Sequence, residues 1–283
     1  MKRIIIHITA LDQKGIVSKY TQSLASMKIN IINIEQHVEP DDKLFFMRLV
    51  AESNDNSFNL SSLKNKLEDI DNDLDALSSI FDYEKKLNLA ILVTKEYLPL
   101  YDILIRHKTN ELNSNLEVII SNHETLKPIA EEFDIDFSFI DIKSNKEEAN
   151  NTLKDILVKK NIDLVILARY MQIIPGDIVK IFEGRIINIH HGFLPAFKGD
   201  HPYHQAWKRG VKIIGATAHY VTDELDEGPI IAQDVAPVTH HHSIAEMMHS
   251  GRNLERNVLI SSLRAHTEYR VIIHGKRTII FNK

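Results

Sequence analysis

The sequence contains no cysteine among its 283 residues, and this absence narrows the chemistry available to the protein. Without cysteine there is no disulfide bond, no thiolate nucleophile and no sulfur-ligated zinc site. A chain that does without disulfides suits a reducing compartment, so we expect a cytoplasmic protein.

Long apolar runs and a strong positive charge are also missing. No stretch approaches the roughly 20 apolar residues that span a bilayer. The basic amino terminus contains His7 and reaches Asp12 without a small-residue cleavage site, so it is predicted to be a strand rather than a signal peptide. The formal net charge of −5 provides no basic field for a phosphate backbone. We therefore expect neither a nucleic acid nor a membrane as partner, and a small molecule instead.

The first part of the chain has the pattern of a small αβ domain. Its apolar residues recur with strand and helix periods in the order strand, helix, strand, strand, helix, strand. The expected elements cover residues 3–10, 16–27, 29–38, 44–50, 60–74 and 76–83. This βαββαβ order is the ferredoxin-like plan, and the charged break at 84–86 ends it, which gives a first domain of residues 1–84.

From residue 85 to residue 283 the pattern changes to alternating strands and helices. Such alternation predicts an α/β domain with a mostly parallel sheet and helices on both faces. The expected strands are 89–93, 116–121, 137–140, 164–168, 185–190, 213–221 and 230–235, followed by a hairpin at 271–280. The expected helices are 98–106, 125–133, 146–160, 177–182 and 243–267.

Polar residues end the strand at 185–190. Because ligands bind beyond the carboxyl ends of parallel strands, Asn188 and His190 are expected at the edge of a cleft, and Asp226 follows in an acidic loop. An amide, an imidazole and a carboxylate suit a reaction through a tetrahedral intermediate at a carbonyl carbon. Asn188 would donate to the oxyanion, His190 would move a proton, and Asp226 would orient the imidazole or hold the attacking water.

Each residue alone has a simpler interpretation, as a turn former or a solvated charge, and only the combination favours catalysis. The run His240-His241-His242 does not change this prediction. Consecutive residues of an extended chain point to alternate faces, so a surface turn is favoured and no metal site is expected.

The same residues carry a resemblance to a known family. Asn188-Ile189-His190 with Leu194-Pro195, and His219-x-Val221 with Asp226-x-Gly228, resemble the signature of the Rossmann-like formyltransferase fold that uses 10-formyltetrahydrofolate. Residues 6–49 are similar to an ACT domain, a regulatory or oligomerisation module. This order of domains resembles the formyltetrahydrofolate deformylase family.

The resemblance implies hydrolysis of 10-formyltetrahydrofolate to formate and tetrahydrofolate, which supplies formate for purine synthesis and balances the one-carbon folate pools. Asn188, His190 and Asp226 would be the catalytic residues, and the folate is a substrate, so no cofactor is required. The substrate-binding residues implied are Arg169, Tyr170, Met171, Gln172, Ile173, Ile174, His219, Thr222 and Asp223.

Several positions depart from the family pattern. Gly192 stands where a serine is expected, Asp200 where a small residue is usual, and Leu98-Pro99 replaces a His-Cys pair. A phosphate-bearing acceptor would need a glycine-rich loop after the first strand of the second domain, and the stretch 93–99 contains no glycine. Water is therefore favoured as acceptor. Transfer to a small amine or sugar, and a non-catalytic protein that responds to amino acids, are the alternatives.

The amino-terminal domain leaves two functions open. It is expected either to assemble a homo-oligomer or to bind a small amino acid as effector. The resemblance places an effector at the loop after the first strand, at Asp12, Gly15 and Ile16. Gly15 would let a backbone approach the ligand closely.

Overall fold

The computed structural model describes residues 2–55, 58–196 and 202–282. The chain forms two compact units. The first consists of Met1–Lys86 together with Glu268–Ile272 and Ile279–Lys283. The second consists of Leu87–Thr267 together with Ile273–Thr278.

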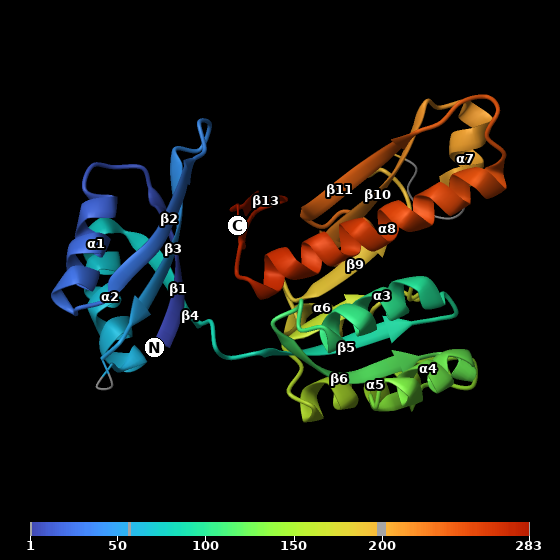
Figure 1. The fold of residues 1–283 in the computed structure, drawn as a ribbon, viewed down its shortest axis with the longest axis horizontal. Helices are drawn as coiled ribbons and strands as arrows, with labels where there is room; N and C mark the ends of the chain where they lie inside the picture. Colours follow the sequence, from blue (N-terminus) through green and yellow to red (C-terminus); the bar gives the residue numbers. More distant parts are fainter. Residues whose placement is uncertain (1, 56–57, 197–201, 283) are drawn as a thin grey trace. The chain divides into compact units, whose positions relative to one another are not determined.

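The first unit is a four-stranded antiparallel sheet with two helices (Figure 1). Its elements are β1 (Lys2–Leu11), α1 (Ile16–Ser26), β2 (Asn30–Val38), β3 (Leu44–Ser53), α2 (Leu60–Leu74) and β4 (Ala76–Asp82). The strand order β2-β3-β1-β4 places β1 between β3 and β4, both antiparallel to it. The βαββαβ plan expected from the sequence is confirmed.

The two faces of this sheet are covered differently. On one face, Ile4, Ile6 and Ile8 pack with α1 and α2 side chains such as Leu24 and Leu67, all of them buried. The strand period of two turns the intervening residues to the other face. There Phe46 packs with Ile279 and Phe281 from the end of the chain.

A buried arginine fixes the C-terminal segments to this unit. Arg48 is only 7% exposed, and it donates to the carbonyl oxygens of Tyr269 (2.7 Å) and Glu268 (3.0 Å). Tyr269 stacks on Phe81 of β4, with ring centroids 4.4 Å apart. Residues that are remote in sequence therefore complete the N-terminal unit.

The second unit is built on a seven-stranded sheet in the order β11-β10-β9-β8-β5-β6-β7. Its strands are β5 (Leu87–Val93), β6 (Ser114–Ser121), β7 (Phe137–Phe139), β8 (Leu164–Leu167), β9 (Ile186–His190), β10 (Ile213–Tyr220) and β11 (Ile230–Pro237). The pairs from β9 to β7 are parallel, whereas β10 and β11 are antiparallel to their neighbours. The mostly parallel sheet is therefore confirmed.

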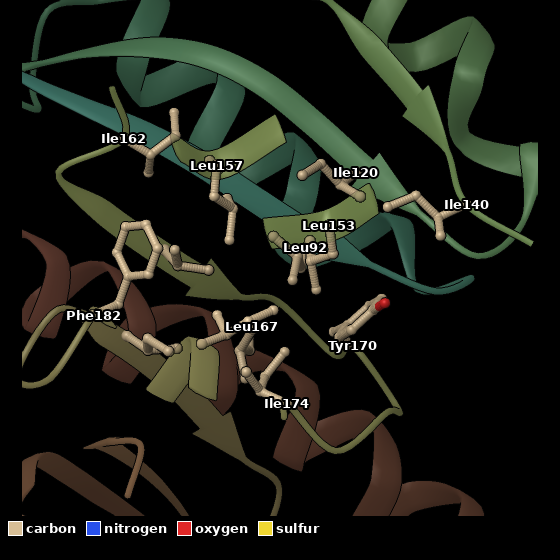
Figure 2. Packing of buried hydrophobic residues seen from close by; sticks show 14 of the residues in the cluster. Leu92, Ile120, Ile140, Leu153, Leu157, Ile162, Leu167, Tyr170, Ile174 and Phe182 are labelled. Atoms are coloured by element: carbon tan, nitrogen blue, oxygen red, sulfur yellow. The ribbon is translucent and has the colours of Figure 1, made fainter. Parts of the chain in front are cut away.

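The central strands β5 and β8 are short, mostly apolar runs because helices cover them. Leu92 and Ile120 pack against Leu153 and Leu157 of α5, as Figure 2 shows. The helices are α3 (Tyr97–Lys108), α4 (Lys127–Glu132), α5 (Lys146–Lys159), α6 (Gly176–Ile181), α7 (Pro202–Arg209) and α8 (Ile244–Thr267). The long α8 packs on β9, β10 and β11.

One expected helix differs from the structure. Residues 125–133 form a 3₁₀ turn, Glu124–Leu126, followed by the short α4. Pro128 lies in the first turn of α4, where its missing N–H costs no helical hydrogen bond. The α-helix therefore begins beside the proline. The hairpin expected at the C-terminus forms as β12 (Val271–His274) and β13 (Arg277–Ile280).

Candidate active site

Three neighbouring strands bring polar side chains to one edge of the second sheet. Asn188 of β9 pairs with Leu167 at the end of β8 on one side. On the other side it lies directly opposite His219 of the antiparallel strand β10. His190 follows two residues later and faces the same side of the strand as Asn188. The register of the sheet therefore places an amide and two imidazoles together.

Asp226 joins this group from the loop between β10 and β11. Its Oδ2 atom lies 3.3 Å from Nδ1 of His190, and its Oδ1 atom lies 3.7 Å from Nε2 of His219. The His190 and Asp226 side chains are 5% and 8% exposed. Little water screens this pair, so its electrostatic interaction is stronger than it would be at the surface.

The hydrogen bonds of His219 define its tautomer. Nδ1 lies 2.8 Å from the carbonyl oxygen of Tyr220, and a carbonyl only accepts, so Nδ1 carries the proton. Burial lowers the pKa of His219, which favours the neutral ring. Nε2 is then an acceptor, and the Nδ2 amide of Asn188 donates to it across 3.1 Å. This bond sets which way the Asn188 amide points.

The loop that carries Asp226 has an unusual backbone. Asp226 has φ 56°, in the left-handed region that costs a non-glycine residue about 1 kcal/mol. Two residues later, a Cβ added at Gly228 would lie 1.7 Å from the carbonyl oxygen of Tyr220. Only glycine lets the loop pass so close to β10. The loop geometry thus turns the carboxylate toward His190.

These residues line a cavity of about 370 Å³ at the carboxyl ends of β8 and β9. Every residue that the sequence nominated as catalytic or substrate-binding lies in its wall: Arg169, Tyr170, Met171, Gln172, Ile173, Ile174, Asn188, His190, His219, Thr222, Asp223 and Asp226. Four further lining residues were not predicted from the sequence: Leu167, Ile189, His191 and Val221. In the sequence, only their position next to predicted site residues could have indicated that they line the cavity. The loop from Thr222 to Asp226, predicted as a whole to contact the folate, also contributes Glu224 and Leu225.

A second group of polar side chains lies at the border of this cavity, and of its members only Arg169 was predicted from the sequence. Arg169, which has φ 64°, is within 3.7 Å of Glu255 on α8, measured from Nη1 to Oε2. Tyr203 of α7 donates its hydroxyl to Oε1 of Glu255 across 2.9 Å. Glu255 is 3% exposed. Its only sequence signal is its helical spacing from Gly251 and Val258, which places it on the buried face of α8.

The residues that depart from the family pattern have separate locations. The carbonyl oxygen of Gly192 accepts from the Thr217 hydroxyl across 2.9 Å. Leu98 and Pro99 lie in the first turn of α3. Asp200 lies outside the described residues.

The described part of the chain holds no cluster of three or more His or acidic side chains suited to a metal ion. Nor does any helix of this part have the length and apolar character needed to cross a membrane. His240 and His241 lie in a turn before α8, with their rings 3.9 Å apart.

The residues nominated for an effector lie in the first unit, between β1 and α1. Gly15 precedes α1 with φ 98°, a conformation that favours glycine. Asp12 donates its backbone N–H to the Lys43 carbonyl oxygen across 2.7 Å, and Ile16 is buried. The loop is thus tied to the turn between β2 and β3.

Comparison with known proteins agrees with this geometry. Residues 87–263 match the formyl transferase family. The formyltetrahydrofolate deformylase of Synechocystis sp. is 41% identical over 275 residues, which cover 97% of this chain and 96% of that protein. The crystal structure of a formyltetrahydrofolate deformylase from Pseudomonas syringae pv. tomato superposes with a TM-score of 0.96 and 38% identity, covering 100% of this chain and 95% of the other.

A glycinamide ribonucleotide transformylase from Symbiobacterium toebii is a more distant relative, with a TM-score of 0.67 and 29% identity. The similarity covers 70% of this chain and 95% of that one. The deformylases, in contrast, are matched over nearly their whole length, including the amino-terminal unit. The resemblance inferred from the sequence is confirmed, and the chain belongs to the formyltetrahydrofolate deformylase family.

Proposed function

We propose that this protein is a cytoplasmic hydrolase that converts 10-formyltetrahydrofolate and water to formate and tetrahydrofolate. The observation that carries the proposal is the convergence of Asn188, His190 and Asp226 in one cavity. An amide donor, an imidazole and a carboxylate are the groups that addition of water to a formyl carbon needs. The full-length similarity to deformylases supports the same reaction.

In the first step the oxygen of water adds to the formyl carbon. The pair of His190 and Asp226 takes the proton that the water loses, with Asp226 stabilising the imidazolium that forms. The formyl oxygen becomes an oxyanion and accepts from Asn188. One N–H of that amide is already directed at His219, so the second one is the donor to the oxyanion. Such a donor contributes about 3 kcal/mol in other enzymes.

In the second step the bond between the formyl carbon and N10 of the folate breaks. N10 takes the proton held by His190, which gives tetrahydrofolate, and the one-carbon fragment leaves as formate with release of one proton. No covalent enzyme intermediate is needed, and no cofactor takes part. The pterin ring is proposed to lie between the segment 169–174 and the loop 222–226, which line the cavity.

The proposal is tested by incubating the purified protein with 10-formyltetrahydrofolate under anaerobic conditions without an added acceptor. Formate and tetrahydrofolate are expected in equal amounts. If neither formate nor tetrahydrofolate is released, the proposal is wrong. The two alternatives are tested in the same way, since a formylated amine or sugar formed faster than formate would indicate a transferase. Amino-acid binding without folate turnover would indicate a non-catalytic protein.

For the amino-terminal domain predicted over residues 1–84, we propose an ACT-like role in assembly or in regulation of the catalytic domain predicted over residues 85–283. The βαββαβ fold and the glycine at the start of α1 support it. A small amino acid would bind at Asp12, Gly15 and Ile16, and copies of the chain would form a homo-oligomer. Calorimetry with the amino acids, on wild type and on Gly15→Val, tests the effector, because a side chain at φ 98° distorts the loop.

A further inference from the structure

The C-terminal hairpin of β12 and β13 is shared by the two units of the chain. Its two arms, residues 268–272 and 279–282, belong to the first unit, whereas its tip, residues 273–278, belongs to the second. The arms are tied to each other. Phe281 donates its backbone N–H to the Arg270 carbonyl oxygen across 2.8 Å, and Nη1 of Arg270 donates to the Phe281 carbonyl oxygen across 3.2 Å. The hairpin is therefore one covalent element that has partners in both units.

The arms of the hairpin contact all four strands of the first sheet. The carbonyl oxygen of Tyr269 lies 2.8 Å from Nε2 of His7 on β1, and it also accepts from the buried arginine of β3 described above. The Tyr269 ring stacks on Phe81 of β4. On β2, Oε2 of Glu35 accepts the backbone N–H of Asn282 across 2.9 Å. The arms therefore follow the position of the sheet as a whole.

The tip of the hairpin is fixed beside the catalytic residues of the second unit. The Thr278 hydroxyl donates to the carbonyl oxygen of Ile230 across 2.6 Å. Ile230 lies opposite His219 in the pairing of β10 with β11, at a β-bulge, and it comes two residues after Gly228 in the chain. Bulges often lie beside active sites, where they direct a side chain. A displacement of Thr278 therefore acts both on His219 and on the end of the loop that carries Asp226.

Further contacts hold the tip in place. A Cβ added at Gly184, shortly before β9, would be 3.0 Å from Cδ1 of Ile273, so glycine lets the tip pack against the start of that strand. Nζ of Lys276 lies 3.5 Å from Oε2 of Glu224 and 3.9 Å from Oε2 of Glu227, but such exposed pairs contribute little. The packing at β9 and the hydrogen bond to β11 are therefore the contacts on which the position of the tip depends.

We propose that the C-terminal hairpin transmits a change in the amino-terminal sheet to the catalytic residues and thereby regulates deformylation. The inference deepens the proposed function and rests on it. β1 leads directly into the loop proposed to bind an amino acid, and it also carries His7, whose Nε2 binds the hairpin. An effector that shifts β1 displaces the arms, and the tip then displaces Ile230. Because the two binding events are linked, substrate in the cleft alters the affinity for the effector by the same factor.

Hydrogen exchange of the full-length protein without substrate tests the proposal. Phe281→Ala loosens the arms on the first sheet. We expect it to speed the exchange of the amides in 219–230 about fivefold or more and to lower kcat for formate release. Phe45→Ala is the matched control, because both phenylalanines are 4% exposed but Phe45 packs under the helices, on the face opposite the arms. The control is expected to destabilise the first unit and to leave exchange in 219–230 unchanged.

Thr278→Val tests the other end of the hairpin, because it removes the hydroxyl that binds Ile230 and keeps the first unit intact. Alone, it is expected to speed exchange in 219–230 about fivefold. In its presence, Phe281→Ala should change that exchange by less than about twofold, since the connection is already broken. Protection of the β1 amides reports whether the first unit is folded in each variant.

Three results would overturn the proposal. They are wild-type exchange of 219–230 in Thr278→Val, equal acceleration by Phe281→Ala and Phe45→Ala, and additive effects of Thr278→Val and Phe281→Ala. Exchange is measured without turnover, whereas formate release by wild type is scored on its own. A failure of this inference is thereby distinguished from a failure of the proposed function.

Discussion

A single tautomer at His219 organises the amide that we assign to oxyanion stabilisation. Because Nδ1 donates to the Tyr220 carbonyl, Nε2 is left to accept from Asn188. An imidazolium at this position would have no acceptor nitrogen and would release the amide. Burial, which lowers the pKa of His219, therefore preserves the orientation of Asn188.

The pair of His190 and Asp226 is predicted to account for the proton transfers. Asp226→Asn and His190→Ala are each expected to lower kcat by about 100-fold or more, with thermal unfolding close to that of wild type. Glu227→Gln is the control, since this exposed residue is in the same loop and pairs with Lys276 rather than with His190. Near-normal formate release by Asp226→Asn would refute the assignment.

Gly228 is predicted to be irreplaceable for steric reasons. A methyl group at this position would overlap the Tyr220 carbonyl, so the loop that holds Asp226 would have to move. We expect Gly228→Ala to lower the free energy of unfolding by about 2 kcal/mol or more and to reduce turnover. Gly176→Ala is a suitable comparison, because its Cβ would meet only the side chain of Asp223. Equal urea midpoints for the two variants would count against this explanation.

At the level of elements, α5 depends on the cap at its first turn. The Asn145 side chain accepts from the backbone N–H groups of Glu147 and Glu148, at 3.1 and 3.2 Å. Asn145→Ala leaves both donors without this acceptor and is expected to cost about 1 kcal/mol in urea unfolding. Asn151→Ala, an exposed change within the same helix, should cost nothing measurable. A similar loss in both variants would show that capping is not the cause.

The spacing of apolar residues predicted the elements well because, in both sheets, it reflects which faces of each strand are buried. The run at 164–167 is apolar throughout, as a strand covered on both faces must be. The helix expected at 125–133 was wrong in detail because periodicity does not register how Pro128 sets the start of α4. Propensity and period thus predict the existence of an element better than its ends.

The candidate site was only partly predictable. Asn188 and His190 could be found because they end an apolar strand, and Asp226 because it follows in an acidic loop. The contact of Arg169 with Glu255 joins residues on different elements, and no local pattern encodes it. The left-handed backbone at Arg169 and Asp226 was equally hidden, since neither residue type requires that conformation.

For the whole molecule, two partly buried histidines are predicted to make stability depend on pH. Burial lowers the pKa of His7 and of His266 from 6.5 to about 4. The positive charge of Arg48 lowers the pKa of His7 further, whereas the hydrogen bond of His7 to the Tyr269 carbonyl opposes the shift. Arg185 faces His266, whose Nδ1 shares a hydrogen bond with the Tyr220 hydroxyl. The unfolded chain therefore binds these protons more tightly than the folded one.

Because the folded pKa is depressed, the stability is present above about pH 6.5 and is lost as the pH falls toward 4. Between pH 7.5 and pH 5 each histidine is expected to cost about 2 kcal/mol. His266→Gln keeps a side chain that can hydrogen-bond Tyr220 but does not titrate, so its free energy of unfolding should depend less on pH than that of wild type. His240→Gln, in an exposed turn, serves as control. If the free energy of unfolding changes with pH in the same way in wild type and His266→Gln, titration of His266 is not the cause of the pH dependence.

The packing of Phe281 on Phe46 has a consequence for how the chain is made. Amino-terminal units of long chains fold first during translation. Here β1 to β4 can assemble early, but Ile279 and Phe281, which pack on their second face, are synthesised only after the whole second unit. Until Phe281 leaves the ribosome, the nascent protein carries an uncovered apolar surface around Phe46.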